Sequence, residues 1–452
     1  MSFEITYANK RMVIPEISCN CGYPHGVPDI DVFIGAGILP YCAKYIRNRS
    51  LGNKLVLVAD NNTYAVAGRH VEKILKEGGF QVTLCLLERE DELKPDERAI
   101  GEALLSMDAD TDFLVAVGSG SITDITRYTA FNTGRPFVSV GTAPSMDGYT
   151  SVVAPLLFNG QKVNKPASCP KIILCDIDVM RTAPVPMFVS GVGDVLGKYI
   201  AKADWLLGNI VNDEAYCPVC ADLVTQAVDK CMANIGEIKN RTPEGTRILI
   251  EALILAGITI LILGNTRPVA SIEHNMGHYW EMRKLARKEE VPSHGIAVGI
   301  GTIYALKFFE IFRGLDLSDI NKEQIKRNRL TRRERIQRMK EGYGAKIAEA
   351  IMKENPEDFL EWEEQDRRIE AVRTNGEQIR EAIKFLPSAR ELIRVMQELG
   401  APTSASEIGV DSDLLRDTLQ YAKDYRSRYT VFKTLDELGL LDDAIDKVLS
   451  LT

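Results

Sequence analysis

Three of the five histidines in this chain, His274, His278 and His294, fall within one short window of the sequence. Imidazole nitrogens held near each other on rigid elements are what a divalent metal ion requires. Upstream, Asp194 stands between glycines, and its carboxylate could complete the ligand set. These residues predict a metal site with one aspartate and two histidines. The alternative is that His274 and His278, four apart on one helical face, are half-buried polar side chains bonded to the backbone or to Glu273.

A second group of residues has the pattern of a dinucleotide cradle. The run Gly118-Ser119-Gly120-Ser121 follows an apolar strand and opens a helix, where glycines let the backbone approach a ligand and free amides complement a pyrophosphate. It lacks the third glycine of G-x-G-x-x-G, so a plain tight turn is the alternative. Asp60 ends a strong strand, where a carboxylate would bond the ribose hydroxyls of NAD and repel the extra phosphate of NADP. Equally, Asp60 could simply cap the following helix.

The elements that must position these residues alternate over the first part of the chain. A helix is expected over residues 71–76, with Gly78 and Gly79 ending it. Strand and helix in repetition indicate a parallel sheet covered on both faces, which binds ligands at the carboxyl ends of its strands. The predicted strands cover residues 31–37, 54–60, 81–87, 113–118 and 137–140.

From about Pro184 the chain changes to long helical segments, with helix starts at residues 212–214 and 242–244. The predicted fold is therefore a Rossmann-like α/β domain over residues 1–184, followed by an all-α domain over residues 185–452. A basic helix is expected over residues 326–340, and its basic side chains are interpreted as a solvent-exposed face. The apolar stretch from Ile248 to Leu263 carries Glu251 and is too short for a membrane span, so it predicts a buried core helix.

Composition narrows the class of function. A net charge of -8 argues against a nucleic-acid surface or a polybasic membrane anchor, so a small-molecule enzyme fits better. Nine cysteines, an odd number, with no signal peptide visible at residues 1–5, indicate a reducing cytoplasm. Two cysteine groups, Cys19/Cys21 with His25 and Cys217 with Cys220, could form a joint zinc site only if the fold brings them together. Thiols with at most a packing role are the favoured interpretation.

Several motifs together resemble one enzyme family. These are residues 118–124, the run Gly141-Thr142-Ala143-Pro144-Ser145-Met146-Asp147-Gly148-Tyr149-Thr150-Ser151, Gly193-Asp194 through Ala203-Asp204-Trp205, Glu273-His274, and His294-Gly295. Their order and spacing over roughly residues 25–310 resemble the sn-glycerol-1-phosphate dehydrogenases, especially the bacterial branch. That family belongs to the metal-dependent, iron-type alcohol dehydrogenase superfamily, with glycerol dehydrogenase and dehydroquinate synthase. The resemblance implies the dehydroquinate synthase-like architecture.

The resemblance also implies roles for individual residues. Asp194, His274 and His294 are the implied metal ligands, Asp147 the implied substrate contact, and His278 a residue near the substrate that could relay a proton. The implied cofactor residues, with Asp60 added, are Gly118, Ser119, Gly120, Ser121, Asp124, Thr142, Ser145 and Ser151. Candidate cations for a substrate phosphate are Lys162 and Lys198, with Lys165 and Arg267 as further candidates.

The implied reaction is reversible reduction of dihydroxyacetone phosphate to sn-glycerol 1-phosphate by NADH or NADPH. One divalent ion per subunit, zinc, nickel or iron, would polarise the carbonyl. Alternatives are a polyol dehydrogenase for unphosphorylated substrates, a dehydroquinate synthase-like lyase, or a regulatory protein that binds nucleotide without turnover. We expect a cytoplasmic enzyme for a phosphorylated triose, without nucleic-acid or membrane partners, that forms a homodimer or higher homo-oligomer. The motifs do not cover the chain beyond about Leu315.

Overall fold

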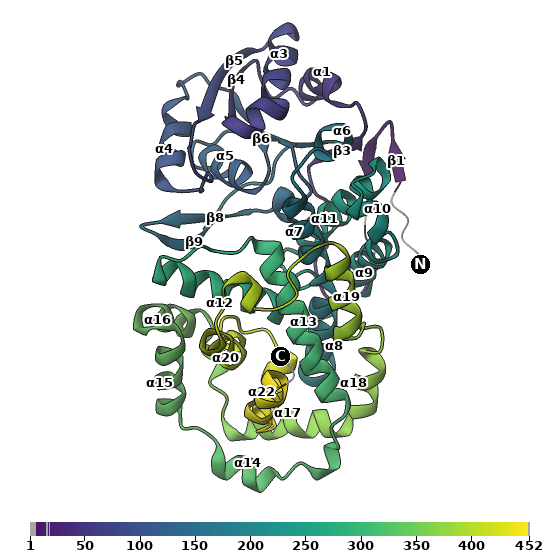
Figure 1. Cartoon of the computed structure of the whole chain (residues 1–452), viewed down its shortest axis with the longest axis vertical. Coiled ribbons are helices and arrows are strands. Elements are labelled where there is room, and N and C mark those ends of the chain that lie inside the picture. The colour runs from purple at the N-terminus through teal and green to yellow at the C-terminus, as the bar shows by residue number, and fades with distance from the viewer. Residues whose placement is uncertain (1–5, 15–16, 18, 451–452) are drawn as a thin grey trace. The chain divides into compact units, whose positions relative to one another are not determined.

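The computed structural model describes residues 6–14, 17 and 19–450 (Figure 1). Contacts divide the chain into two compact units. The N-terminal unit comprises 24–195, 222–265 and the described part of 1–19, and the C-terminal unit comprises 20–23, 196–221 and the described part of 266–452. This division follows packing, so a boundary between independent domains at residues 184 and 185 stays a prediction. The segment 1–5, on which the expected lack of a signal peptide rests, lies outside the described residues.

An eight-stranded sheet forms the centre of the N-terminal unit, in the order β1-β2-β3-β10-β7-β6-β4-β5. The strands from β3 to β5 in this order pair in parallel, whereas β1 and β2 are antiparallel additions at one edge. The parallel sheet and all five predicted strands are confirmed. The bounds are β1 (Thr6–Ala8), β2 (Arg11–Val13), β3 (Asp31–Gly35), β4 (Lys54–Asp60), β5 (Gln81–Leu87), β6 (Phe113–Gly118), β7 (Phe137–Gly141) and β10 (Ile172–Asp176).

Helices cover both faces of this sheet because its strands are apolar on both faces. In β4, Leu55 and Leu57 pack in one cluster with α1 (Cys42–Asn48) and α3 (Arg69–Glu77). Val56 and Val58 point to the other face and pack with α4 (Glu97–Leu105) and α5 (Gly120–Asn132). The predicted helix over residues 71–76 is α3, and it ends at Gly78, followed by Gly79 with φ +85°. The continuous apolar strands therefore dictate the doubly covered sheet.

Several elements of the N-terminal unit were not predicted, among them β1, β2 and three later strands. Strand β10 inserts between β3 and β7, although its sequence from Ile172 to Asp176 is an apolar run of the same kind as the others. Strands β8 (Val153–Phe158) and β9 (Gln161–Pro166) form a separate antiparallel hairpin. Asn159 and Gly160 in its turn both have positive φ, which is the Asn-Gly hairpin signal that sequence reasoning could have used.

The chain after β10 is helical, as predicted. The N-terminal unit adds α6 (Ile177–Met180), α7 (Val185–Leu196), most of α9 (Pro218–Ala233), α10 (Ile235–Lys239) and α11 (Pro243–Leu263). The C-terminal unit, over its described residues, has helices as its regular elements (Figure 1). These are α8 (Lys198–Asn212), α12 (Ile272–Arg287), α13 (His294–Arg313), α14 (Lys322–Asn328), α15 (Arg332–Tyr343), α16 (Ala345–Glu354), α17 (Trp362–Thr374), α18 (Gly376–Ala382), α19 (Ala389–Glu398), α20 (Ser412–Tyr421), α21 (Val431–Glu437) and α22 (Leu441–Ser450).

Two local predictions are wrong. Residues 212–214 end a helix, because Asp213 adopts the left-handed conformation at the C-cap of α8, with φ +53°. The basic segment 326–340 is not one helix, because it is broken between α14 and α15, where Arg329 is extended and Thr331 forms a capping box with Glu334. The helix start at residues 242–244 is confirmed, since the Thr242 side chain caps α11.

By length and composition, α11 and α13 could each cross a membrane. Of the apolar window, 83% in α11 and 78% in α13 is buried inside the structure. The charge within α11, Glu251, is also compensated, because it accepts hydrogen bonds from Arg247 at 2.5 Å and Lys230 at 3.1 Å. Both helices thus have the environment of core helices, and the predicted buried core helix is confirmed as part of α11.

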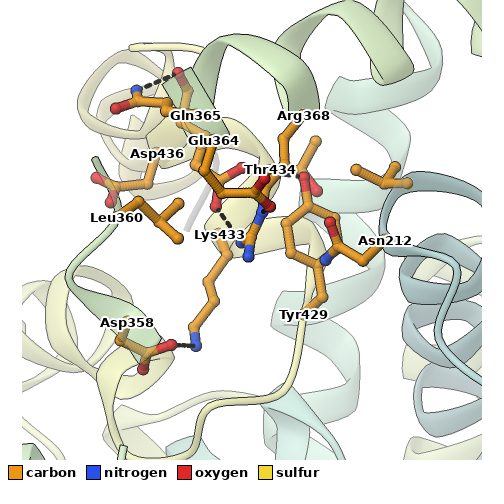
Figure 2. Close-up of polar contacts among 12 residues, drawn as sticks. Asn212, Asp358, Leu360, Glu364, Gln365, Arg368, Tyr429, Lys433, Thr434 and Asp436 are labelled. Atoms are coloured by element: carbon orange, nitrogen blue, oxygen red, sulfur yellow. Dashed lines mark hydrogen bonds and ion pairs between the residues drawn. The ribbon is translucent and has the colours of Figure 1, made fainter. Parts of the chain in front are cut away.

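The segment beyond Leu315, left open by the motifs, is held together by a partly buried polar network (Figure 2). Arg368 on α17 pairs with Glu364 at 2.8 Å and with Glu437 on α21 at 3.0 Å. Lys433, also on α21, pairs with Asp358 at 2.7 Å. Because α21 packs directly on α13, this network supports the helix that begins with His294.

Candidate active site

The histidines of the predicted metal site lie at the starts of α12 and α13 in the C-terminal unit. His274 is the third residue of α12 and His294 the first of α13. Their ring centroids are 5.3 Å apart, and one ligand nitrogen of each lies within 4.8 Å of the other. The two helices approach closely at Gly301, where a Cβ would lie 2.6 Å from the carbonyl oxygen of Glu273. A glycine on α13 therefore lets this helix pack closely against the first turn of α12.

The buried carboxylate of Glu273 orients His274. It accepts the proton of His274 Nδ1 at 2.7 Å and the backbone N–H of Ser271 at 2.8 Å. A proton on Nδ1 leaves the lone pair on Nε2, and a carboxylate behind the imidazole is the usual support of a metal-binding histidine. The expected alternative, a bond to Glu273, is thus present, and it is the arrangement that a metal ligand needs.

A second buried carboxylate, Asp204, continues this network. It accepts the Ser271 hydroxyl at 2.6 Å and the backbone N–H of Val431 at 2.8 Å. Burial raises the pKa of Asp204 to about 7. The network fixes the first turn of α12 against the segment that leads into α21.

Asp194, the predicted carboxylate ligand, lies on α7 in the N-terminal unit and is fully buried. Its Oδ2 accepts the backbone N–H of Asp147 at 2.9 Å. One turn earlier, a Cβ on Gly191 would lie 2.0 Å from the carbonyl oxygen of Pro144. Gly191 therefore allows α7 to contact the backbone of the loop that carries Asp147. These two predicted site residues are brought together.

Arg127, which sequence reasoning missed, holds that loop from the other side. Its fully buried guanidinium pairs with Asp124 at 2.7 Å and donates to the carbonyl oxygens of Gly148 at 2.5 Å and Tyr149 at 3.0 Å. A weaker contact reaches the Val153 carbonyl oxygen at 3.3 Å. Acid and base three residues apart on a helix read as an ordinary surface pair, so the sequence gives no sign that this arginine is a clamp.

The predicted cofactor turn has the expected strand-turn-helix geometry. Strand β6 ends at Gly118 and α5 begins at Gly120. A Cβ on Gly118 would lie 2.5 Å from Ile122 Cβ, so this glycine allows helix and strand to pack closely. At Gly120 the nearest atom to such a Cβ is 3.8 Å away, and the Ser119 side chain makes no cap bond to the helix amides. Amides at such a helix start suit an anion.

Asp60 ends β4 beside this turn and makes a capping box. Its Oδ1 accepts the backbone N–H of Thr63 at 2.7 Å, and its own N–H donates to Thr63 Oγ1 at 3.0 Å. The capping interpretation is therefore confirmed. A ribose contact by Asp60 remains a prediction, and so does a cofactor contact by Asp124, whose carboxylate faces Arg127.

The chain is similar in sequence to known proteins. Residues 33–184 match the family model "Iron-containing alcohol dehydrogenase". A glycerol-1-phosphate dehydrogenase [NAD(P)+] of Halalkalibacterium halodurans is 30% identical over 422 residues, covering 93% of this chain and 95% of the relative. Its counterpart in Bacillus subtilis is 30% identical over 410 residues, covering 90% and 91%. The chain belongs to the glycerol-1-phosphate dehydrogenase family. Since the match spans most of the chain, it includes much of the segment beyond Leu315.

Solved structures agree on the fold of this family member. Glycerol dehydrogenase from Schizosaccharomyces pombe superimposes with a TM-score of 0.59 at 15% identity, covering 93% of this chain and 90% of that one. An archaeal alcohol dehydrogenase from a Red Sea brine pool gives 0.60 at 14% identity, covering 94% and 100%. At these identities the likeness shows the fold alone, and it confirms the predicted α/β and helical architecture.

The candidate phosphate-binding cations of this family member differ in environment. Arg267 forms a two-pronged pair with Glu214, at 2.7 and 2.8 Å, and also bonds the Tyr429 carbonyl oxygen, so it acts in packing. Lys198 is buried at the first residue of α8, with 2% exposure. On β9, Lys162 is half-buried and Lys165 is exposed. Lys162 and Lys198 therefore stay the candidates for a buried anion.

The remaining predicted residues also have defined surroundings. His278 lies one turn after His274, with its ring 5.6 Å from that of His294 and its Nδ1 3.5 Å from Glu281 Oε2. Thr142 and Ser145 are buried; the Thr142 N–H donates to the Gly118 carbonyl oxygen at 3.1 Å. Ser151 closes a local turn, since its hydroxyl donates to the Val153 carbonyl oxygen at 2.8 Å.

Proposed function

We propose that this chain catalyses the reversible oxidation of glycerol 1-phosphate by NAD(P)+. Loss of hydride from the secondary alcohol gives dihydroxyacetone phosphate, so the reverse reaction is the NAD(P)H-dependent reduction of that ketone. The observation that carries the proposal is similarity over nearly the whole chain to relatives with this activity in their name. The local geometry of the predicted site residues supports it.

We propose that Asp194, His274 and His294 hold one divalent ion. The donor set fits such an ion, because Glu273 fixes the His274 tautomer with its lone pair on Nε2 and the Asp147 amide orients the Asp194 carboxylate. Zinc, nickel and iron all suit one carboxylate and two imidazoles. When bound, the ion supplies Lewis-acid polarisation of the substrate carbonyl, and the nicotinamide supplies the hydride.

The nucleotide is proposed to lie along the carboxyl edge of the sheet. The amides of the turn at residues 118–121 would face its phosphates, and Asp60 its adenosine ribose. Thr142, Ser145 and Ser151 would line the nicotinamide, on the loop that Arg127 clamps. NAD and NADP are both named for the relatives. A ribose contact by Asp60 would favour NAD.

Substrate and proton are assigned to the remaining residues. Asp147 would contact the substrate hydroxyl. Its backbone is held in place by the hydrogen bond from its N–H to Asp194. His278, whose Nδ1 lies 3.5 Å from Glu281 Oε2, would exchange a proton with the carbonyl oxygen. Lys162 and Lys198 would hold the phosphate, since half-buried and buried ammonium groups bind anions more strongly than exposed ones. We also propose a cytoplasmic homodimer or higher homo-oligomer.

The test combines metal analysis with kinetics of the purified chain. We expect dihydroxyacetone phosphate to exceed dihydroxyacetone by at least roughly tenfold in kcat/KM, because a charge-assisted phosphate contact contributes about 1.5–3 kcal/mol. Lys162→Met should reduce this preference, and Lys165→Met, exposed on the same strand, is the matched control. Equal rates with both ketones would point to a polyol dehydrogenase, and no turnover with any ketone would contradict the proposal.

Ligand variants test the metal assignment separately. His274→Ala and His294→Ala should lose bound metal and activity, whereas His278→Ala should retain metal and lose turnover. His70→Ala, on the exposed surface of α3, controls for the loss of an imidazole. If His278→Ala loses the metal while His274→Ala keeps it, the ligand assignment is wrong.

A further inference from the structure

A second set of metal-binding side chains lies outside the proposed active site. In the N-terminal unit, Cys19 Sγ and His25 Nε2 are 3.9 Å apart. In the C-terminal unit, the sulfur atoms of Cys21 and Cys217 lie within 4.8 Å of each other. Cys21 lies between Cys19 and His25 in the sequence. The short segment 19–25 therefore keeps the Cys19/His25 pair near the Cys21/Cys217 pair. Three thiols and one imidazole are therefore gathered by a short segment and one distant cysteine.

Aromatic contacts hold this segment in place. The Tyr23 hydroxyl donates to the carbonyl oxygen of Ala215 at 3.0 Å, and the Trp205 indole N–H donates to the same oxygen at 2.8 Å. The rings of Tyr23 and Trp205 meet edge to face, with centroids 6.2 Å apart. Ala215 is two residues before Cys217. The hydrogen bond from Tyr23 to Ala215 therefore holds Cys21, two residues before Tyr23, near Cys217.

The sulfur of Cys217 is held at the start of α9. Cys217 is fully buried and immediately precedes α9; its carbonyl oxygen accepts the first helical bond, from Ala221. Its sulfur accepts the backbone N–H of Cys220 at 3.5 Å, which is the bond an N-cap side chain makes. The backbone at the start of α9 therefore fixes the position of this sulfur atom.

We propose that Cys19, Cys21, His25 and Cys217 bind one zinc ion in a closed, structural site. Three cysteines and one histidine are a standard ligand set for structural zinc, and four protein ligands leave no position for a substrate. Thiolates select zinc over harder ions, in contrast to the oxygen and nitrogen donors of the proposed active site. Cys220 is not among the side chains whose ligand atoms lie within 4.8 Å of one another. The chain then carries two ions rather than one.

The zinc would join segment 19–25 to the start of α9, which lie almost two hundred residues apart in the sequence. Such a cross-link supplies folding free energy, because the preformed ligand set does not exist in the unfolded chain. Its function is therefore stability of the segment that leads into β3, and it does not depend on the proposed reaction.

The experiment counts metal in the full-length chain, prepared with zinc under reducing conditions and measured by plasma mass spectrometry. Wild type should hold two equivalents of zinc. Cys217→Ser and His25→Ala should each lose one equivalent, whereas Cys220→Ser and His70→Ala, the matched controls, should keep both. His294→Ala should lose the other equivalent, so each set of variants reports on one site.

Cobalt substitution gives a readout that is independent of activity. Thiolate-to-cobalt charge transfer absorbs in the near ultraviolet, and wild type and His294→Ala should both show this band. It should be absent from His25→Ala and Cys21→Ser, whose half-buried positions keep them testable if Cys217→Ser does not fold. A wild-type chain without the band, or a Cys19–Cys21 or Cys21–Cys217 disulfide found by mass mapping of the reduced preparation, would overturn the proposal. Failure of the ketone assays would leave it standing.

Discussion

Replacement of Arg127 by methionine tests how the substrate loop is positioned. The guanidinium is fully buried and bonds one carboxylate and two well-placed carbonyl oxygens, those of Gly148 and Tyr149. Methionine fills most of the volume but removes every donor. Asp124 is then left as a partly buried carboxylate facing an apolar chain, and the loop that carries Asp147 loses its anchor on α5.

The expected cost follows from these contacts. Removal of one partner from a buried ion pair costs about 3–5 kcal/mol, and this range includes the uncompensated charge. Each carbonyl oxygen left without its donor adds about 1 kcal/mol. We therefore expect Arg127→Met to lower the free energy of unfolding by about 5–7 kcal/mol. The double variant Arg127→Met/Asp124→Asn should recover about 3–5 kcal/mol of this loss, since only the carbonyl contacts then stay lost.

The loss should also depend on pH. Burial already raises the pKa of Asp124 to about 7 with Arg127 beside it, and removal of the arginine raises it further. A carboxyl whose pKa is higher in the folded than in the unfolded state loses stability as pH rises between the two values. Arg127→Met should therefore be more destabilised at pH 8 than at pH 5, while the double variant should show little difference.

The assay must report on the N-terminal unit. Trp205, Trp280 and Trp362 all belong to the C-terminal unit, so tryptophan fluorescence does not follow unfolding around Arg127. Urea unfolding by circular dichroism, with hydrogen exchange of the β6 and α5 amides, does. A change below about 0.5 kcal/mol in Arg127→Met, the level of an ordinary surface substitution, would refute the clamp.

Three further results are expected. Asp60→Ser should raise NADPH use relative to NADH in steady-state kinetics by removing the charge that repels a 2′-phosphate; an unchanged ratio would mean that Asp60 only caps its helix. The pKa of Asp204 is about 7 in the folded chain, against an ordinary value of 3.8, so the free energy of unfolding should fall as pH rises from about 4 to 7. Urea titration at several pH values measures this profile, and Asp204→Asn should flatten it over that range. Gly191→Ala, whose Cβ would lie 2.0 Å from the Pro144 oxygen, should cost about 1–3 kcal/mol and weaken metal binding, whereas Gly236→Ala, in open space, should do neither.

Local patterns determined much of the fold. The continuous apolar runs of β4 and β6 predict strands buried on both faces, and such strands form a parallel sheet between helices. Gly78 and Gly79 mark the end of α3, and the positive φ at Gly79 suits glycine. The identities of Asp194, His274 and His294 also predict a metal ligand set without coordinates, since donor chemistry is a property of the side chain.

Contacts between distant residues needed the tertiary structure. The break between α14 and α15, and the left-handed end of α8 at Asp213, depend on capping and packing that short-range periodicity does not encode. From sequence alone, Arg127 and Asp124 would be taken for a surface ion pair. The structure shows that Arg127 also donates to the carbonyl oxygens of residues 148 and 149.

The cysteines show the same division most clearly. The spacing of Cys19, Cys21 and His25 is visible in the sequence, but one short segment supplies only three ligands. The tertiary structure supplies the proposed fourth ligand, Cys217, whose sulfur lies within 4.8 Å of the other three ligand atoms, whereas Cys220 is not in that group. Sequence fixes which atoms can bind a metal, whereas long-range packing decides which of them meet, because that choice depends on the burial and hydrogen bonding of the whole chain.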